Sequence, residues 1–295
     1  MRASTLLFAF TLACTSGTRP IDRDAQLADA SAPPDAGSDA GTFDAGPPGD
    51  GGPRLDDVLI YAHSRDTLYT FSAYTGTVTE IGRFTLPNGS DAPFMVDLAV
   101  NAAGDVYTSS DTSLYRVDPT TARATLVGDF RIGSERLFAL TFLSAGEYRA
   151  DREALIGATN AGTYYEVDPR DASTTELGQY PDGWSSSGDL VSIEGLGTFA
   201  TLRRTDFPAD VLGRILFASD GSSTVVVVGP VTDGTTDFTE IFGLGYWGRA
   251  LYGFSNDGQL IEIDRMTGRG TAVPVSTGAS QFWGAGVTTQ APILF

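Results

Sequence analysis

The sequence of 295 residues has few of the side chains on which metal and thiol chemistry depends. It contains one cysteine (Cys14) and one histidine (His63), and all 19 of its basic residues are arginine. A single cysteine excludes a disulfide framework and a cysteine-cluster zinc site, and a single histidine excludes a histidine-based metal cluster. The absence of lysine excludes a glycine-rich phosphate loop that ends in lysine. We therefore expect neither a metal nor a cofactor.

Positive charge is also scarce, because 19 basic residues face 37 acidic ones and the formal net charge is −18. A protein that follows nucleic-acid phosphates needs a basic stripe, so we expect no nucleic-acid partner. Hydrophobic residues make up 41% of the chain and aromatic residues 11%. This content is enough for a sizeable core and excludes a wholly disordered chain.

No long hydrophobic run is present, and the N-terminus carries only a short one. Arg2 precedes a nine-residue apolar run from Thr5 to Ala13. About 20 residues are needed to span a bilayer core, so the run is too short for a membrane helix. It does suit the apolar region of a secretory signal. We interpret residues 1–13 as a signal peptide.

The end of this run, Leu12-Ala13-Cys14-Thr15, resembles the lipobox of bacterial lipoproteins, in which small residues precede a cysteine. The resemblance implies that Cys14 is lipidated and becomes the mature N-terminus, held in a membrane. Threonine rather than aspartate at position 15 implies the outer membrane. The motif departs from the family at Thr11, where leucine is usual. An ordinary cleaved signal followed by an unrelated cysteine therefore stays an alternative.

Residues 14–56 are expected to form a disordered tether. All but four of the thirty residues from 24 to 53 are Asp, Ala, Gly, Pro or Ser, and the triplet Asp-Ala-Gly occurs three times. Such a segment has almost nothing to bury and cannot offset the entropy of ordering. We interpret it as a spacer that holds a domain away from a membrane; low-complexity sequence with no other role is the alternative.

From residue 57 onward, short apolar runs alternate with turn residues, and one hairpin recurs five times. The hairpins start at Leu68, Leu114, Tyr164, Arg214 and Leu260, which are 46, 50, 50 and 46 residues apart. This period fits the four-stranded blade of a β-propeller, at about 40–50 residues per repeat. The expected blades are 57–84 with 281–290, then 94–130, 136–180, 187–231 and 239–276.

The first blade lacks an innermost strand before its hairpin, and the missing strand is found at the other end of the chain. The segment 282–287 has the same pattern as the innermost strand that begins at Phe242. Closure by three strands plus one removes a free edge. We predict an all-β, five-bladed β-propeller over residues 57–295, with 3+1 closure between its N- and C-terminal strands.

The hairpins follow a pattern of a strand, Asp-Pro-x-Thr-Gly and a second strand, and they resemble the repeats of bacterial secreted propellers. Together with the Asp-Ala-Gly tether, the chain is similar to uncharacterised lipoproteins of gliding soil bacteria. This resemblance implies a fold and a cellular location, but it does not imply a ligand. The recurring Asp118, Asp168 and Asp264 are interpreted as turn residues that accept backbone N–H groups rather than as metal ligands.

Aromatic and acidic residues recur near the start of the innermost strands or in loops close by. The candidate ligand-binding residues are Asp97, Phe138, Asp189, Phe242, Trp247 and Trp283. We expect them to surround one mouth of the central channel. Aromatic faces with a few carboxylates suit a glycan or a peptide. The alternative is that the aromatic rings pack between the blades.

No Gly-x-Ser-x-Gly nucleophile motif is present. We therefore expect a non-catalytic binding propeller whose partner is a glycan, a peptide or an envelope protein; a structural protein that docks onto a partner stays open. The alternative is a glycoside hydrolase of a five-bladed type that uses Asp97, Asp189 and Glu194. Such chemistry needs two carboxyl groups about 5–9.5 Å apart. Leu196 replaces the proline expected after Glu194-Gly195 in those families.

Overall fold

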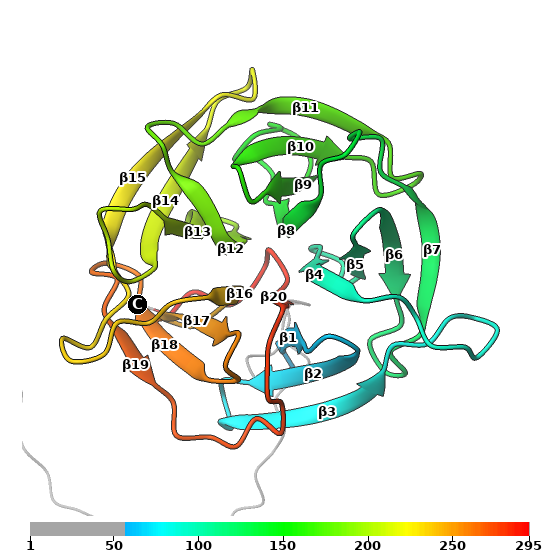
Figure 1. The fold of residues 1–295 in the computed structure, drawn as a ribbon, viewed down its shortest axis with the longest axis horizontal. Helices are drawn as coiled ribbons and strands as arrows, with labels where there is room; N and C mark the ends of the chain where they lie inside the picture. The colour runs from blue at the N-terminus through cyan, green and yellow to red at the C-terminus, as the bar shows by residue number, and fades with distance from the viewer. Residues whose placement is uncertain (1–56, 295) are drawn as a thin grey trace, which may run out of the picture. The chain divides into compact units, whose positions relative to one another are not determined.

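A computed structural model describes residues 57–294 of the chain. The predicted signal peptide (1–13), lipidated Cys14 and tether (14–56) lie outside the described residues. Within residues 57–294, twenty strands form five four-stranded sheets, and these sheets surround a common axis (Figure 1). Within residues 57–294, no helix is long and apolar enough to cross a membrane. The predicted five-bladed β-propeller is confirmed.

Each blade is an antiparallel sheet whose four strands follow one another from the axis outward. Blade 1 is β20 (Gly284–Gly286), β1 (Ile60–His63), β2 (Thr67–Ser72) and β3 (Thr77–Arg83). Blade 2 is β4 (Met95–Val100), β5 (Val106–Ser110), β6 (Ser113–Val117) and β7 (Ala124–Asp129). Blade 3 is β8 (Leu137–Leu143), β9 (Ala154–Thr159), β10 (Thr163–Val167) and β11 (Thr174–Gln179). Blade 4 is β12 (Ser185–Ile193), β13 (Gly197–Arg203), β14 (Val211–Phe217) and β15 (Ser223–Pro230). Blade 5 is β16 (Ile241–Trp247), β17 (Ala250–Ser255), β18 (Leu260–Asp264) and β19 (Gly270–Ala272).

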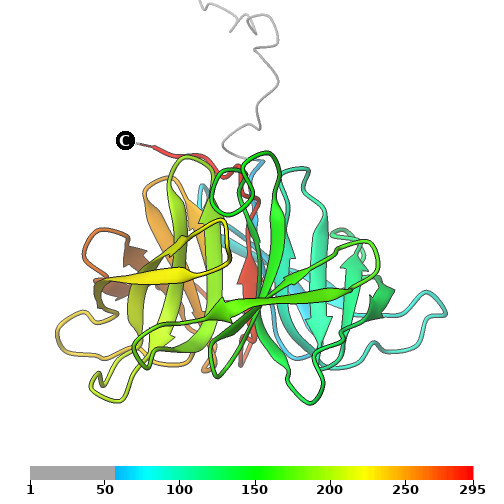
Figure 2. The same cartoon turned by 90° about the horizontal axis from the view of Figure 1, so that it is seen from above.

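The ring closes in blade 1 by the predicted 3+1 arrangement. The C-terminal strand β20 pairs antiparallel with β1, with Ala285 opposite Ala62. β20 lies at the axis beside the other innermost strands, which run along the axis in the side view (Figure 2). Because the last strand completes the first blade, β1 is paired on both sides and the first blade has four strands like the others.

The hydrophobic core lies between neighbouring blades. Leu68 and Leu98 are buried together between blades 1 and 2, and the corresponding contact between blades 2 and 3 contains Leu114. Further apolar clusters join blades 3 and 4 and connect blades 4, 5 and 1. No blade buries its apolar faces alone, so the stability of each blade depends on its neighbours.

At the rim, a glycine near the end of the outermost strand lets one blade touch the turn of the next. A Cβ on Gly128 would lie 2.4 Å from the carbonyl oxygen of Asp171, and one on Gly229 would lie 2.3 Å from that of Thr267. Only a residue without a side chain permits this approach. The glycine that recurs at the end of the repeated hairpins is therefore a contact between blades.

The recurring aspartates act as turn residues, as predicted. Asp118, Asp168 and Asp264 each accept the backbone N–H of the residue two positions further on, at 2.8, 2.9 and 2.9 Å. These Asx turns hold the link between the third and fourth strands of three blades.

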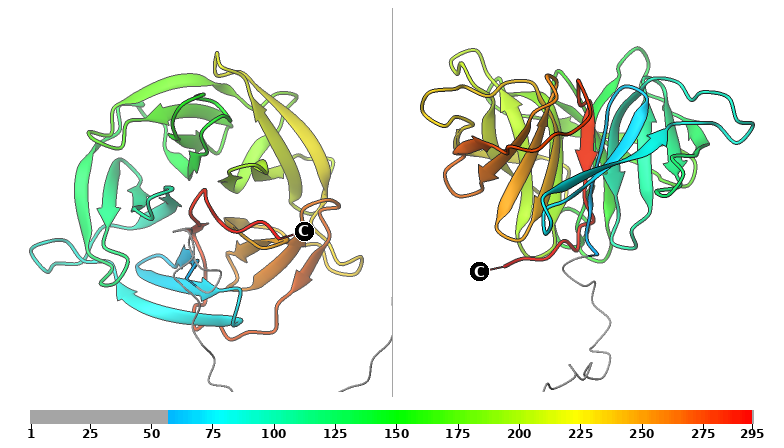
Figure 3. Two further views of the ribbon diagram at one scale, coloured as in Figure 1. Left: turned by 180° about the vertical axis from the view of Figure 1, so that it is seen from behind. Right: turned by 90° about the horizontal axis from the view of Figure 1, so that it is seen from below.

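The segment that follows β20 crosses one end of the ring (Figure 3). Thr288 forms a bridge with Val100 at the end of β4, and Ile293 forms one with Gly248 just after β16. Both partners lie where an innermost strand ends. The C-terminal segment therefore covers the end of the channel opposite to the one at which these strands begin.

Candidate functional site

Five residues, one from each blade and each in the first half of an innermost strand or directly before it, line a single pocket on the axis. This mouth ring consists of Val96, Phe138, Gly188, Phe242 and Trp283. In β4, β8 and β16 the mouth-ring residue is the extra residue of a β-bulge, since strand pairing steps from 95 to 97, from 137 to 139 and from 241 to 243. A bulge redirects the side chain that it contains. Local sheet geometry therefore turns these residues toward the pocket.

This axial pocket has a volume of about 300 Å³. Its other lining residues are Asn160, Ser186, Ser187, Arg203 and Asn256. Trp283 packs edge-on against Phe94 with ring centroids 4.7 Å apart and lies 5.8 Å from Phe242. Three aromatic residues from three blades, Phe138, Phe242 and Trp283, thus line the mouth. Because every blade contributes a residue, the pocket exists only when the ring is closed.

Three polar atoms of the lining residues are buried without a partner. Ser186 Oγ, Asn256 Oδ1 and Trp283 Nε1 have no hydrogen-bond partner among the described residues. Buried polar atoms are nearly always paired, and an unpaired one costs about 1–3 kcal/mol. They are a hydroxyl, an amide acceptor and an indole donor whose hydrogen-bonding capacity is unused among the described residues.

The residues that follow the mouth ring by one position form a second, deeper ring. This hub ring consists of Asp97, Ala139, Asp189, Gly243 and Gly284. Both aspartates are fully buried. The small members leave room for them, because a Cβ on Gly284 would lie 2.2 Å from Asp97 Oδ1. The two carboxyl groups therefore occupy the axis itself.

Each hub carboxyl joins the innermost strands of two neighbouring blades. Asp97 Oδ1 accepts the N–H of Leu98 at 2.8 Å, and its Oδ2 accepts that of Leu140 in β8 at 2.5 Å. Asp189 repeats the arrangement with the residue after it and with Leu244 in β16, both at 2.6 Å. The two carboxyls therefore connect blade 2 to blade 3 and blade 4 to blade 5 by hydrogen bonds near the axis.

Burial raises the pKa of both Asp97 and Asp189 well above the usual range of a carboxyl. The negative charge of Asp189 raises the pKa of Asp97 further, and the two carboxyls hydrogen-bond to each other. Two buried carboxyls in contact cannot both ionise at little cost, so the pair retains a proton.

His63 lies beside this pair, fully buried at the end of β1. Its Nδ1 lies 2.7 Å from the Ser64 carbonyl oxygen and donates a hydrogen bond to it. In the neutral ring Nε2 then carries no proton, and it has no partner among the described residues. Burial lowers the pKa of His63 to about 4, so the ring is neutral. Within residues 57–294, no group of three or more metal-ligating side chains could hold a metal ion.

The structure brings some of the candidate residues together and separates others. Phe138, Phe242 and Trp283 line one pocket. Asp97 and Asp189 also meet, but beneath the pocket instead of at its surface. The reason is a shift of one residue: the aspartates follow the mouth-ring positions, and successive residues of a strand point to different sides.

Trp247 and Glu194 lie at the other end of their blades. Trp247 ends β16, five residues after Phe242, and packs 6.2 Å from Tyr74. Glu194 is exposed in the turn after β12, five residues beyond Asp189. Five residues of strand span about 16 Å. The structure therefore does not bring Trp247 to the mouth or Glu194 to the buried carboxyls.

Sequence reasoning missed the polar part of the lining. Asn160 and Asn256 follow the second strands of blades 3 and 5, and Arg203 ends β13. These residues can be recognised as lining residues only when it is known that the second strands β9, β13 and β17 end at the mouth. The sequence pattern alone does not show this.

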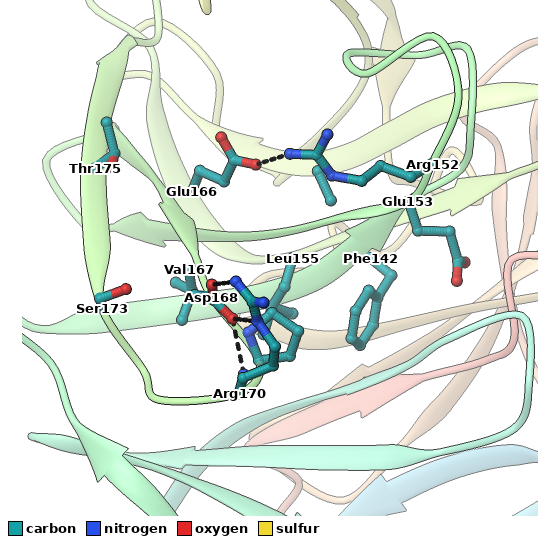
Figure 4. Close-up of a pocket in the computed structure, with 12 residues that line it drawn as sticks. Phe142, Arg152, Glu153, Leu155, Glu166, Val167, Asp168, Arg170, Ser173 and Thr175 are labelled. Carbon is teal, nitrogen blue, oxygen red and sulfur yellow. Dashed lines mark hydrogen bonds and ion pairs between the residues drawn. The ribbon is translucent and has the colours of Figure 1, made fainter.

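A larger cavity of about 580 Å³, the blade groove, lies on blade 3 (Figure 4). Its charged side chains bind one another or the backbone. Arg170 pairs with Asp168 at 2.5 Å, and Arg152 lies 3.4 Å from Glu166. Both oxygens of Glu153 lie 3.0 Å from one backbone N–H. The groove therefore offers no unsatisfied charge to a ligand.

No protein-family model and no curated protein matches the sequence. Among solved structures, U3-55K is similar at 13% identity over 77% of this chain and 66% of its own, with a TM-score of 0.42. A protein of unknown function from Bacteroides caccae is similar at 10% identity over 78% and 98%, also with a TM-score of 0.42. Virginiamycin B lyase from Staphylococcus aureus is similar at 14% identity over 73% and 66%, with a TM-score of 0.38. Similarities this low carry no argument about function.

Proposed function

We propose that this protein is a lipid-anchored outer-membrane protein whose propeller binds a glycan or peptide ligand in the axial pocket, without catalysis. The observation that carries the proposal is the pocket itself. All five blades line it, three aromatic residues line it, and three buried polar atoms of its lining residues have no partner among the described residues. Apolar walls with a few convergent polar groups are typical of ligand sites.

The burial of the hub carboxyls supports the absence of catalysis. A glycoside hydrolase needs carboxyls that reach the scissile bond. Asp97 and Asp189 are both fully buried, and their oxygens accept backbone N–H groups. Glu194 lies at the far end of β12. Among the described residues, nothing favours the hydrolytic alternative.

Thermal unfolding of the full chain against panels of glycans and short peptides tests the binding function. A ligand at 100 times its dissociation constant stabilises the folded state by about 2.7 kcal/mol, which raises the unfolding midpoint. We expect Phe242→Ala and Trp283→Ala to abolish this shift. Arg170→Ala, on the blade groove, is the matched control and should preserve it. An equal shift in all three variants would contradict binding at the axial pocket.

The anchor rests on the sequence around Cys14 and is tested separately. We expect the protein to sediment with the outer membrane and a Cys14→Ser variant to appear in the soluble fraction. A variant that stays in the membrane fraction would refute lipid anchoring. Protease treatment of intact cells would show whether the propeller faces the medium or the periplasm.

A further inference from the structure

We infer that the ligand of the axial pocket is a single neutral pyranose residue at the end of a glycan chain. This inference rests on the proposed binding function and narrows its ligand class. Four properties of the pocket support it: the hydrogen-bonding groups of the lining residues, their apolar surface, their charge and the volume that they enclose.

The unpartnered atoms match the hydroxyl groups of a sugar. Ser186 is 8% exposed, and its Oγ can both donate and accept. Asn256 Oδ1 accepts and Trp283 Nε1 donates. Sugar hydroxyls also donate and accept, so a sugar supplies hydrogen-bond partners of the kinds that these atoms lack. A purely apolar ligand would leave them unpaired, as they are among the described residues.

The aromatic side chains match the apolar face of a pyranose. Phe242 and Trp283 are tilted by 42° to each other with centroids 5.8 Å apart, and Phe138 contributes from a third blade. The edge of Phe94 supports Trp283. Aromatic rings offer large, rigid surfaces that bury the C–H groups of a ligand. A ligand with an apolar face and polar edges fits both sets of side chains.

The charges of the lining disfavour an ionised ligand. Arg203 is the one ionisable residue among the described residues that line the pocket. Its guanidinium lies 3.6 Å from the buried Asp210, which largely offsets its charge. No described carboxylate lines the pocket to bind an amine, and the net charge of −18 opposes an anion. A neutral sugar needs no carboxylate to bind it and is not repelled by the negative net charge.

The size of the pocket limits the ligand to one residue. Its volume of about 300 Å³ is at the lower end for ligand pockets, which span about 300–1,000 Å³. The C-terminal segment crosses the opposite end of the ring, so a chain cannot thread through the channel. A sugar residue at the end of a glycan enters from the open side.

Calorimetric titration of the full chain with methyl glycosides tests the inference. The probes are the methyl glycosides of glucose, galactose, mannose and N-acetylglucosamine, with the methyl glycosides of glucosamine and glucuronic acid as charged counterparts and acetylated tetrapeptides as the competing class. We expect at least one neutral glycoside to bind, and both charged glycosides to bind at least tenfold more weakly than it.

Two variants connect the affinity to the pocket. Phe242→Ala should weaken the neutral glycoside at least tenfold. Trp283→Phe keeps an aromatic ring but removes Nε1, and it should weaken binding about threefold to tenfold; Arg170→Ala should have no effect. Tetrapeptides that bind through Phe242 while no neutral glycoside binds would overturn the sugar class but leave the proposed function. If no probe responds to Phe242→Ala, both fail.

Discussion

The axial pocket and the blade groove show that the size of a cavity does not decide what it can bind. The groove has nearly twice the volume, about 580 Å³ against 300 Å³. Its charged groups, however, bind one another or the backbone. The lining of the smaller axial pocket holds buried polar atoms that have no partner among the described residues. A ligand gains more from unpaired groups than from groups that it must first separate.

The carboxyls of the two regions differ in the same way. Asp168, in the groove, is half-buried beside Arg170, which lowers the pKa of Asp168 to about 2. In the hub, burial raises the pKa of Asp97 and Asp189. The groove therefore favours ionised pairs close to solvent, whereas the burial of the hub carboxyls favours their protonated form. Similar residue types in the same repeats acquire opposite properties from their depth in the ring.

The largest expected effect is the loss of a hub carboxyl. Asp189→Ala would leave two buried backbone N–H groups unpaired, those of Leu190 and Leu244. At about 1–3 kcal/mol for each group, we expect the free energy of unfolding to fall by about 3 kcal/mol in urea denaturation. Asp168→Ala in the groove is the control and should cost less than about 1 kcal/mol. Equal losses of stability in the two variants would show that burial in the hub does not make a carboxyl more important for stability than exposure in the groove.

The next effect is a pH dependence that comes from His63. The folded pKa is about 4 and the unfolded value about 6.5. The unfolded chain therefore binds the proton first, and stability is lost as the pH falls below about 6.5. From pH 7 to pH 5 this loss amounts to about 2 kcal/mol. The hub carboxyls, whose pKa is raised by folding, lower the stability of the folded state as the pH rises. Their contribution between pH 7 and pH 5 is therefore opposite in sign to that of His63.

A His63→Asn variant separates the two contributions, since its amide can still donate toward Ser64. We expect the stability of the variant to fall less than that of the wild type between pH 7 and pH 5, as measured by urea denaturation at each pH. Parallel stability curves would show that His63 does not titrate with a lowered pKa.

A smaller effect is expected from an added methyl group in the hub. Gly284→Ala would place Cβ 2.2 Å from Asp97 Oδ1 and 2.6 Å from His63 Nε2. Such overpacking typically costs about 1–3 kcal/mol. The matched control at the rim is Gly178→Ala, whose nearest atom would be 3.3 Å away, and we expect it to cost less. Thermal unfolding midpoints would rank the two, and a reversed order would contradict the tight packing of the axis.

The sequence predicts the ring well because a blade is a local repeat. The spacing of hairpins from Leu68 to Leu260 and the strand-like segment before Val287 were sufficient for five blades and 3+1 closure. The mouth was predicted only in part. Phe242 and Asp189 appeared equivalent in sequence, but a bulge in the innermost strands places one at the surface and the other beneath it. Bulges arise from pairing between strands, which the pattern of one strand does not show.

The smallest expected effect is in the groove. Arg152→Gln removes an ion pair with Glu166, and exposed pairs contribute about 0–1 kcal/mol. Arg152 is mostly exposed and Glu166 also binds Arg149, so a partner for the carboxylate remains. We expect urea denaturation to detect a loss of less than about 1 kcal/mol and ligand affinity to stay unchanged. A loss of affinity would mean that the groove, with its charges already paired, nevertheless takes part in binding. The assignment of the ligand to the axial pocket would then have to be extended to blade 3.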